Sequence, residues 1–300
     1  MPQRELSVGL AQRTPLHGPT APTAPTALAE LRTDVERTLT RHPELDMLVY
    51  PELHLQGVDH LPTDEQAAAL ARMAVPLDDP YVSKIGEVAA EFGIWLCPGS
   101  IGETTEAGEQ YNTQLLFSPD GTLRASYRKM FPWRPFEPHR PGTEFVVSPV
   151  DGHGTLGLSN CYDAWFPEHS RHLAWMGADA IINIVKTTSQ DRDQELVLAR
   201  ANAIVNQVYM LSVNCAEPVG RGLSIAVDPE GHVLAEAGPG EDTLVVRVDP
   251  GHITRVRARG TAGTNRVWSQ FTADDDPIPL PLYDGQIDPA RWSPHHRGHD

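Results

Sequence analysis

Short apolar runs separated by turn-forming residues recur along most of this chain. Alternation predicts a strand over Leu6 to Ala11, and the apolar run Leu45 to Tyr50 predicts a buried strand. Two hairpins are expected, because Ser118 to Gly121 and Asp228 to Gly231 have the composition of tight turns. The remaining predicted strands are Ile94 to Ile101, Tyr111 to Phe117, Thr122 to Lys129, Glu144 to Ser148, Gly154 to Asn160, Ala180 to Val185, Tyr209 to Cys215 and Thr243 to Val248.

Helical spacing of apolar residues lies between several of these strands. A helix is expected around Leu28 to Leu39, after a proline-rich loop from Pro15 to Pro25. The other predicted helices are Ala67 to Val75 with Thr63 and Gln66 as a capping box, a helix over Ile85 to Phe92 closed by Gly93, Pro167 to Met176, and Asp191 to Gln207. This mixture indicates sheets covered by helices on their outer faces, although the pattern alone does not decide between one sheet and two.

Composition narrows the class of protein. A chain of 300 residues with 40% hydrophobic content can bury a large core, and it is interpreted as one domain over 1–300, with a core of about 5–250. The formal net charge of −16 gives no support for a nucleic-acid or anionic-membrane partner. No apolar run approaches the roughly 20 residues that span a bilayer, and the N-terminus does not resemble a signal peptide, so a cytoplasmic location is expected.

One of the three cysteines occupies a position suited to chemistry. Cys161 follows a predicted strand and precedes a predicted helix, where backbone N–H groups can stabilise a thiolate or an oxyanion. A thiol needs a base or a nearby positive charge to react, and Glu52 and Lys129 also lie at the ends of predicted strands. None of the 13 histidines has such a place, so a carboxylate base and a lysine are favoured over a papain-like histidine.

Three segments together resemble the nitrilase, or carbon-nitrogen hydrolase, superfamily. They are Leu-Val-Tyr-Pro-Glu-Leu-His-Leu-Gln-Gly at 48–57, Tyr-Arg-Lys-Met-Phe-Pro-Trp-Arg-Pro-Phe-Glu-Pro at 127–138, and Gly-Leu-Ser-Asn-Cys-Tyr-Asp-Ala-Trp-Phe-Pro-Glu at 157–168. The resemblance implies a four-layer α-β-β-α sandwich with a C-terminal arm over about 251–300. It implies Glu52 as general base, Lys129 as catalytic lysine, Cys161 as nucleophile and Glu137 as a supporting carboxylate. The backbone N–H of Tyr162 would share the oxyanion with Lys129, and no cofactor would be required.

Local sequence favours one branch of that superfamily. The lysine segment and Cys-Tyr-Asp resemble its amidase and formamidase members, whereas nitrile-cleaving members usually carry Cys-Trp-Glu. Trp165 stands where many relatives carry an arginine that pairs with a substrate carboxylate, so an uncharged acyl group is expected. The predicted function is therefore hydrolysis of a small non-peptide amide through a thioester. N-carbamoyl amide hydrolysis, nitrile hydrolysis, acyl transfer and a non-catalytic scaffold are the alternatives.

Further candidates follow from position. Trp133, Trp165, Lys186 and Thr187 lie at the predicted strand ends or in their loops, and could line the substrate pocket. Asn160 should point away from Cys161 toward a buried polar partner, because neighbouring strand residues face opposite ways. Cys97 and Cys215 are expected to be buried apolar residues.

Two expectations concern the C-terminal part and the assembly. His295, His296 and His299 offer metal ligands in principle, but a mobile tail is the preferred interpretation because no rigid element would fix their geometry. Resemblance implies a homodimer or a higher homo-oligomer, with Arg255 to Phe271 in an arm that crosses to the second subunit. The expected partners are thus a small amide and a second copy of this chain.

Overall fold

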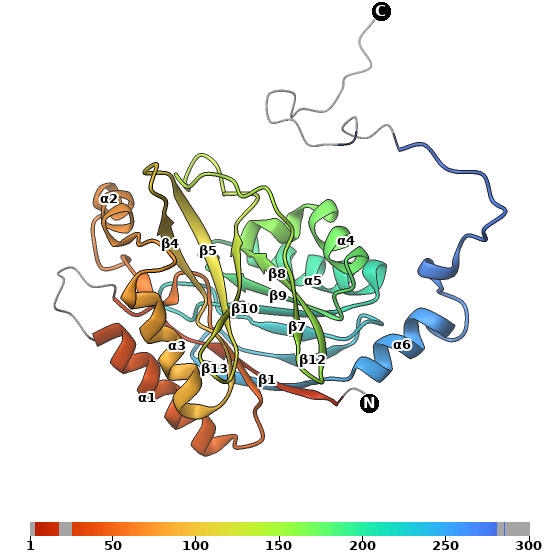
Figure 1. Ribbon diagram of the computed structural model, residues 1–300, viewed down its shortest axis with the longest axis horizontal. Helices are drawn as coiled ribbons and strands as arrows, with labels where there is room; N and C mark the ends of the chain where they lie inside the picture. Colours follow the sequence, from red (N-terminus) through yellow and green to blue (C-terminus); the bar gives the residue numbers. More distant parts are fainter. Residues whose placement is uncertain (1–3, 18–25, 281–284, 286–300) are drawn as a thin grey trace, which may run out of the picture.

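The computed structural model describes residues 4–17, 26–280 and 285, and its framework is two β-sheets (Figure 1). The first sheet follows the order β13-β1-β2-β3-β5-β4, with β6 paired to β5. Its strands are β1 (Leu6–Gln12), β2 (Met47–Val49), β3 (Trp95–Cys97), β4 (Ser100–Thr104), β5 (Gln110–Phe117), β6 (Leu123–Arg128) and β13 (Asp242–Val248). The second sheet has the order β12-β11-β10-β9-β8-β7. It comprises β7 (Val147–Val150), β8 (Gly154–Asn160), β9 (Ala180–Val185), β10 (Tyr209–Asn214), β11 (Ile225–Val227) and β12 (Val233–Glu236).

Helices cover the outer face of each sheet. Figure 1 shows α1 (Thr26–Arg41) and α3 (Pro80–Phe92) on one side, and α4 (Pro167–Trp175) and α5 (Arg192–Asn206) on the other. The remaining helical segments are α2 (Thr63–Met73), α6 (Pro250–Arg259) and the short 3₁₀ helices η1 (His54–Gln56), η2 (Cys161–Trp165) and η3 (Val267–Ser269). No helix in the described ranges is long and apolar enough to cross a membrane.

The apolar strands are buried on both faces, which explains the four layers. In β9, Ile182 packs in the core between the two sheets, while its neighbour Ile181 packs under α4 and α5. In β2, Val49 faces the inter-sheet core and Leu48 faces α1 and α3. Continuous apolar runs are typical of strands with both faces covered. The predicted α-β-β-α sandwich is therefore confirmed.

Both sheets have the same central arrangement, and it places strand ends together. β1, β2 and β3 are parallel in the first sheet, as are β8, β9 and β10 in the second. β6 pairs antiparallel with β5, which pairs antiparallel with β3, so β6 runs in the same direction as β2. The segments that follow β2 and β6 therefore leave the first sheet at the same edge.

Most predicted elements are present, but four details differ. The expected strand Ile94 to Ile101 is divided into β3 and β4 at Pro98 and Gly99, because proline has no N–H to donate and Gly99 has φ +93°. The strand expected at Glu144 to Ser148 lies later, as β7. Thr63 is the first residue of α2 rather than its cap, and Gln66 donates to the carbonyl of Leu61 instead of completing a capping box.

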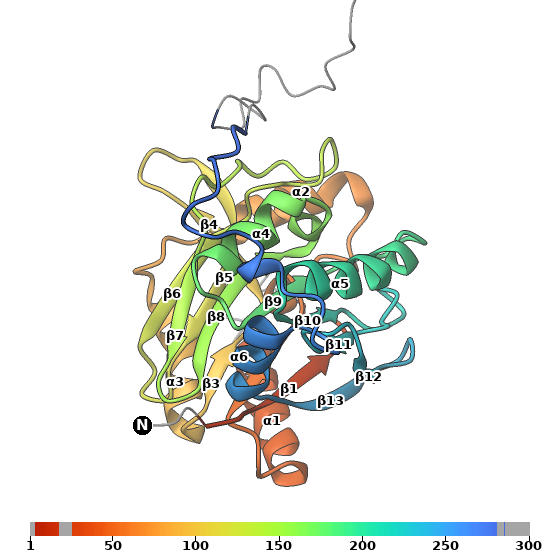
Figure 2. The same ribbon diagram turned by 90° about the vertical axis from the view of Figure 1, so that its right-hand side faces the viewer.

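The fourth difference concerns the predicted arm. Its first residues form α6, whose Ile253 and Val256 are buried in the fold. Figure 2 shows the following segment running past α4 and α5, and Trp268 in η3 donates to the carbonyl of Asn206 at 3.2 Å. Part of Arg255 to Phe271 thus packs on the chain's own helices. The histidines of the tail and residues 18–25 of the predicted loop lie outside the described residues.

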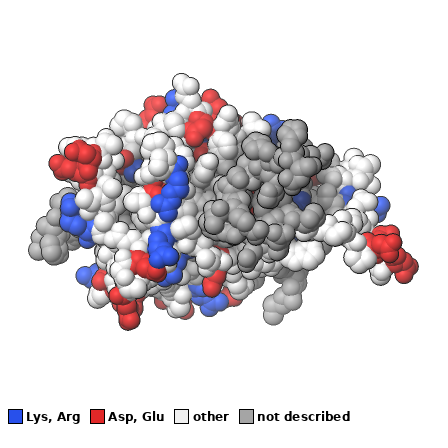
Figure 3. All heavy atoms as spheres, turned by 90° about the horizontal axis from the view of Figure 1, so that it is seen from above, with Lys and Arg blue, Asp and Glu red and all other residues white. Residues whose placement is uncertain are grey.

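Acidic and basic side chains are interspersed on the described surface seen in Figure 3. The formal net charge of −16 is therefore not collected into a single acidic patch on this face. Cys97 and Cys215 are fully buried, as predicted.

The β5–β6 hairpin, which leads to Lys129, is fixed from outside by α3. A Cβ added to Gly86 would lie 2.3 Å from the carbonyl oxygen of Gly121 in the hairpin turn. Alanine normally stabilises a helix interior relative to glycine. Here Gly86→Ala should instead lower the free energy of unfolding by about 1–3 kcal/mol, because the helix and the turn must separate.

Urea unfolding of Gly86→Ala would measure this effect. Gly240→Ala provides the control, since nothing lies within 4 Å of a Cβ added there. A Gly86→Ala protein as stable as the wild type would show that the helix and the hairpin are not in rigid contact.

Candidate active site

Glu52 lies in a loop directly after β2, and the loop is held by neighbouring segments. The N–H of Leu53 donates to Ser100 Oγ at 3.0 Å, and the N–H of Tyr50 donates to the carbonyl of Cys97. Gly99 packs so closely on Pro51 that a Cβ there would be 1.9 Å from the Pro51 carbonyl oxygen. Only glycine fits this approach, and the loop fixes Glu52 in a buried position with 5% exposure.

Cys161 is the first residue of η2, immediately after β8, as the sequence predicts. Its φ of +51° lies in the left-handed region that non-glycine residues rarely adopt. The turn is held by Asp163, whose Oδ2 accepts from the N–H of Asn160 at 2.9 Å. Backbone strain of this kind persists only where surrounding contacts enforce it, and it is typical of functional sites.

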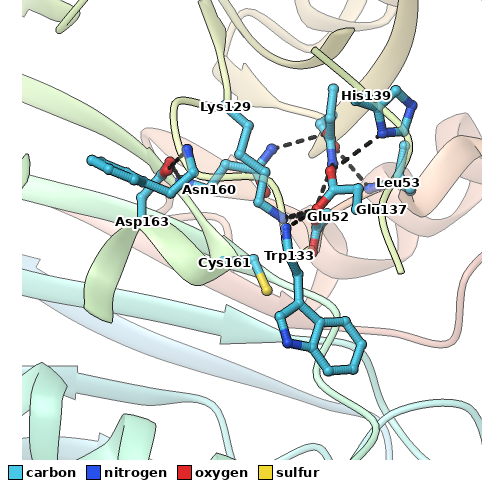
Figure 4. A network of polar contacts seen from close by, with 12 residues as sticks. Glu52, Leu53, Lys129, Trp133, Glu137, His139, Asn160, Cys161 and Asp163 are labelled. Carbon is cyan, nitrogen blue, oxygen red and sulfur yellow. Dashed lines mark hydrogen bonds and ion pairs between the residues drawn. The ribbon is translucent and has the colours of Figure 1, made fainter. Parts of the chain in front are cut away.

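Lys129 directly follows β6 and is almost completely buried. Its N–H donates to the carbonyl of Asn112 on β5 at 2.9 Å, which extends the β5–β6 pairing by one residue. Its Nζ lies 2.9 Å from Glu52 Oε1 and 2.7 Å from Glu137 Oε2. Figure 4 shows the lysine side chain reaching the two carboxylates, with the Cys161 sulfur nearby.

Glu137 is held by four donors or partners from three parts of the chain. Oε2 accepts from Lys129 Nζ and from the N–H of Trp133, the latter at 3.0 Å. Oε1 accepts from Asn112 Nδ2 at 2.9 Å and faces His139 Nδ1 at 3.3 Å. The predicted pairing of Glu137 with Lys129 is thus present in the structure.

The charges of this group depend on one another. Burial disfavours the charged form of Lys129, but Glu52 and Glu137 outweigh that effect and hold the pKa of the ammonium well above its usual value. Burial acts against the Glu137 carboxylate too, yet Lys129 and the surrounding donors keep its pKa below the usual range. Lys129 is therefore a fixed cation at neutral pH, and Glu137 is ionised.

The Cys161 thiol, unlike Lys129 and Glu137, is held in its neutral form. Burial raises the pKa of Cys161 well above its usual value, and the Glu52 carboxylate raises it further, while Lys129 lowers it. The resting sulfur consequently carries its proton. Such a thiol becomes a competent nucleophile only if a nearby base takes the proton during attack.

A comparison with protein families agrees with this arrangement. The family model described as carbon-nitrogen hydrolase matches residues 7–258, which is most of the chain. This chain belongs to the carbon-nitrogen hydrolase family. The superfamily resemblance seen in the sequence is thereby confirmed.

Relatives within the carbon-nitrogen hydrolase family include formamidases. The chain is 31% identical to the formamidase of Pseudomonas syringae pv. tomato over 217 residues, covering 70% of this chain and 62% of the relative. It is 30% identical to a Bacillus cereus formamidase over 205 residues, covering 64% of this chain and 60% of the relative. The chain thus spans about three fifths of the length of these curated relatives.

Solved structures of the same superfamily share the fold. Saccharomyces cerevisiae Nit3, a member of branch 10 of the nitrilase superfamily, matches with a TM-score of 0.74 and 27% identity, covering 85% of this chain and 94% of the yeast chain. A variant of the amidase from Nesterenkonia sp. AN1, in complex with butyramide, matches with a TM-score of 0.65 and 25% identity, covering 84% and 94% of the two chains.

Of the predicted pocket residues, Thr187 lies beside the Cys161 sulfur. Thr187 Oγ1 lies 3.9 Å from Cys161 Sγ and donates to the Glu195 carboxylate at 2.8 Å. Lys186 pairs with Asp59 at 2.8 Å, so its ammonium already has a carboxylate partner. Thr187 is therefore placed beside the sulfur, whereas the Lys186 ammonium is engaged by Asp59.

The aromatic candidates surround the same region. Trp133 is 40% exposed and packs on Phe136, and Figure 4 shows its ring beyond the Cys161 sulfur. Trp165 contacts the ring of Tyr162, and within the described chain its buried Nε1 has no hydrogen-bond partner. Trp165 thus carries an unpaired buried donor within η2, the short helix that begins with Cys161.

Sequence reasoning overlooked two residues that connect the site. Asn112 lies within β5, where no local pattern distinguishes it from other buried strand residues, although its side chain contacts both carboxylates. Asp163 belongs to the Cys-Tyr-Asp segment, but its structural contacts have no signal in the sequence. Its carboxylate also accepts from Tyr127 Oη and from the N–H of Phe131, so it joins the Cys161 turn to the segment around Lys129.

The predicted partner for Asn160 is present. Asn160 Nδ2 donates to Asn112 Oδ1 at 3.0 Å, within the core of the site. Asn160 is fully buried, and the residue before Cys161 is thereby linked to both carboxylates through one amide.

The opposing charges next to Cys161 allow a test of the electrostatics. Glu52→Gln removes a negative charge that raises the pKa of the thiol, while Lys129 remains. The thiol pKa should therefore fall by about one unit or more. Lys129→Met should move it in the opposite direction. The rate of iodoacetamide alkylation of Cys161 as a function of pH, followed by peptide mass spectrometry, would measure both changes.

Circular dichroism would establish that each variant is folded, and Cys161→Ser would give the background from other thiols. An unchanged alkylation profile in Glu52→Gln would contradict a close approach of the carboxylate to the sulfur.

Proposed function

We propose that this chain is a cysteine-dependent amidase that hydrolyses a small non-peptide amide to a carboxylate and ammonia or an amine. The observation that carries the proposal is the buried set formed by Lys129 between Glu52 and Glu137, beside a protonated Cys161. It combines a carboxylate base, a fixed cation and a nucleophile in one site.

In the first step, Cys161 Sγ attacks the amide carbonyl carbon while its proton passes to Glu52. The electron pair of the C=O bond moves to oxygen, and the Lys129 ammonium stabilises the resulting oxyanion. The N–H of Tyr162 supplies a second donor, because amides in the first turn of a helix lack intrahelical partners. Glu137 keeps the ammonium in place and charged.

In the second half, Glu52 gives its proton to the departing nitrogen, and the C–N bond breaks to leave a thioester on Cys161. The same carboxylate then takes a proton from water as the water attacks the thioester carbon. Collapse releases the carboxylic acid, which ionises to the carboxylate in water, and returns the proton from Glu52 to sulfur. Every proton transfer in this cycle uses a side chain of this protein.

The substrate class is supported by the sequence around Cys161 and by the relatives. Cys-Tyr-Asp favours amides over nitriles, and the formamidases among the relatives point to short acyl groups. Trp165 provides no positive charge for a substrate carboxylate. Formamide and short aliphatic amides are therefore the first candidates, ahead of N-carbamoyl compounds.

Replacement of the nucleophile tests the reaction. Cys161→Ala should lower kcat/KM for ammonia release from formamide or butyramide by about 10⁴-fold or more, because the thioester cannot form. Cys161→Ser should retain only a small residual activity. Cys97→Ala is the matched control, since that thiol is buried in β3 away from the proposed chemistry, and it should remain active.

The product distinguishes hydrolysis from acyl transfer, since both pass through the same thioester. Hydroxylamine added to the wild type would capture the acyl group as a hydroxamate if transfer to amines is efficient. Full ammonia release by Cys161→Ala would refute the proposal, and a wild type inert toward all short, aromatic and carbamoyl amides would favour the scaffold alternative.

We also propose a homodimer formed through α4 and α5. Trp175 at the end of α4 is 75% exposed, and Val197 on α5 is 67% exposed, in the chain as described. Burial of large apolar side chains is the main contribution to stable homodimer interfaces. Sedimentation velocity of Trp175→Glu with Val197→Glu should therefore show a monomer.

Leu234→Glu, on the exposed side of β12, is the control for added charge and should leave the dimer intact. A dimer that survives both substitutions on α4 and α5 would place the interface on another surface.

A further inference from the structure

The two oxygens of Glu52 have different surroundings. Oε1 accepts from Lys129 Nζ at 2.9 Å and from Asn112 Nδ2 at 2.8 Å. Oε2 has no hydrogen-bond partner among the described residues. A carboxylate with one oxygen fixed by two donors presents its other oxygen in a single direction.

Both N–H groups and the oxygen of the Asn112 side-chain amide are hydrogen-bonded within this site. Its two N–H bonds go to Glu52 Oε1 and Glu137 Oε1, and its oxygen accepts from Asn160 Nδ2. The opposite orientation of the amide would place its oxygen against two carboxylates. Because that orientation is repulsive, the hydrogen-bond network determines the direction of the amide.

Asn112 also joins segments that are distant in the sequence. Its side chain contacts Glu52 after β2 and Glu137 in the loop after β6, and its carbonyl accepts from the N–H of Lys129. Through Asn160 it reaches the residue before Cys161. Asn112 is only 1% exposed, so bulk water does not compete for these hydrogen bonds.

We propose that Asn112 is a positioning residue of this site: its amide holds one oxygen of Glu52 so that the other oxygen faces the Cys161 proton. The inference rests on the amidase reaction proposed above. In the step concerned, the S–H bond breaks, an O–H bond forms on Glu52 Oε2, and the sulfur electron pair forms the bond to the carbonyl carbon.

A second consequence concerns charge. Two carboxylates share one buried lysine, so the set of Glu52, Glu137 and Lys129 carries a net negative charge when both glutamates are ionised. The neutral amide of Asn112 donates to both carboxylates and favours their ionised forms. Loss of these bonds should make Glu52 easier to protonate.

A substitution at Asn112 retains the other ionisable side chains around Glu52, although it also removes a hydrogen bond from Glu137. In the described chain they include Lys129 after β6, Glu137 and His139 in the following loop, Cys161 in η2, Glu195 on α5 beyond Thr187, and Cys215 after β10 with the Lys186–Asp59 pair beside it. A shift in titration on replacing Asn112 therefore reports the loss of its amide bonds to Glu52 and Glu137 together.

Asn112→Leu keeps a side chain of similar size and removes both donors. The acid limb of kcat/KM, which reports the base in the free enzyme, should move to higher pH by about one to two units, the cost of losing a hydrogen bond to a charged group. At the pH plateau kcat should fall with KM little changed, because the amide positions the base rather than the substrate. Gln114→Leu, two residues further along β5, removes another buried amide and should leave the limb in place.

Carbon-13 NMR of glutamate-labelled protein gives a measurement that needs no turnover. The Glu52 carboxyl signal, assigned by its loss in Glu52→Gln, should titrate at higher pH in Asn112→Leu. This separates the two proposals, because a wild type without amidase activity would refute the function while the NMR titration still tests the role of Asn112.

An unchanged limb and an unchanged Glu52 titration in Asn112→Leu would overturn the inference, as would an equal shift in Gln114→Leu. If circular dichroism shows that Asn112→Leu does not fold, Asn112→Ser replaces it, since the shorter side chain cannot reach either carboxylate. The same upward shift is expected in that variant.

Discussion

The structure depends above all on a buried cation held between two buried carboxylates. Lys129 alone would be costly to bury, and so would Glu52 or Glu137 alone. Together they offset the loss of water through contacts of 2.7–2.9 Å. Removing Lys129 would leave two buried carboxylates without a counter-charge, so the positions of both glutamates depend on the lysine. The segments that carry them are correspondingly braced by the Gly99 contact at Pro51 and by the carboxylate of Asp163.

The fold provides this precision because each contributing segment begins at a rigid strand. β2, β6 and β8 are covered on both faces or held by hairpin contacts, so the residues that follow them have little freedom. The strained turn at Cys161 depends on the same framework, since Asp163 holds it against the segment after Lys129. Stability and site geometry thus have a common origin in the packing between the sheets.

The sequence predicts most of the fold because apolar periodicity is local. It predicts the ends of the elements less well, as at Gly99, which must pack on the distant Pro51, or at Thr63, which begins its helix without capping it. Glu52, Lys129 and Cys161 could be found because residues after strands meet at sheet edges and because their motifs resemble one superfamily. Asn112 could not be found in this way. The role of this polar residue within a strand depends on its contacts with Glu52, Glu137 and Asn160, which are far away in the sequence.

The protonation states of Lys129 and Cys161 limit the role that each can have. Lys129 cannot act as a base, because its two carboxylates hold the pKa of the ammonium well above its usual value. Cys161 does not rest as a thiolate, because burial and Glu52 raise the pKa of the thiol. In the proposed reaction, the proton therefore leaves sulfur in the same event that brings the carbonyl carbon to it, when charge moves to an oxygen that Lys129 can stabilise. An arrangement of this kind keeps the sulfur inactive until a carbonyl group is in place.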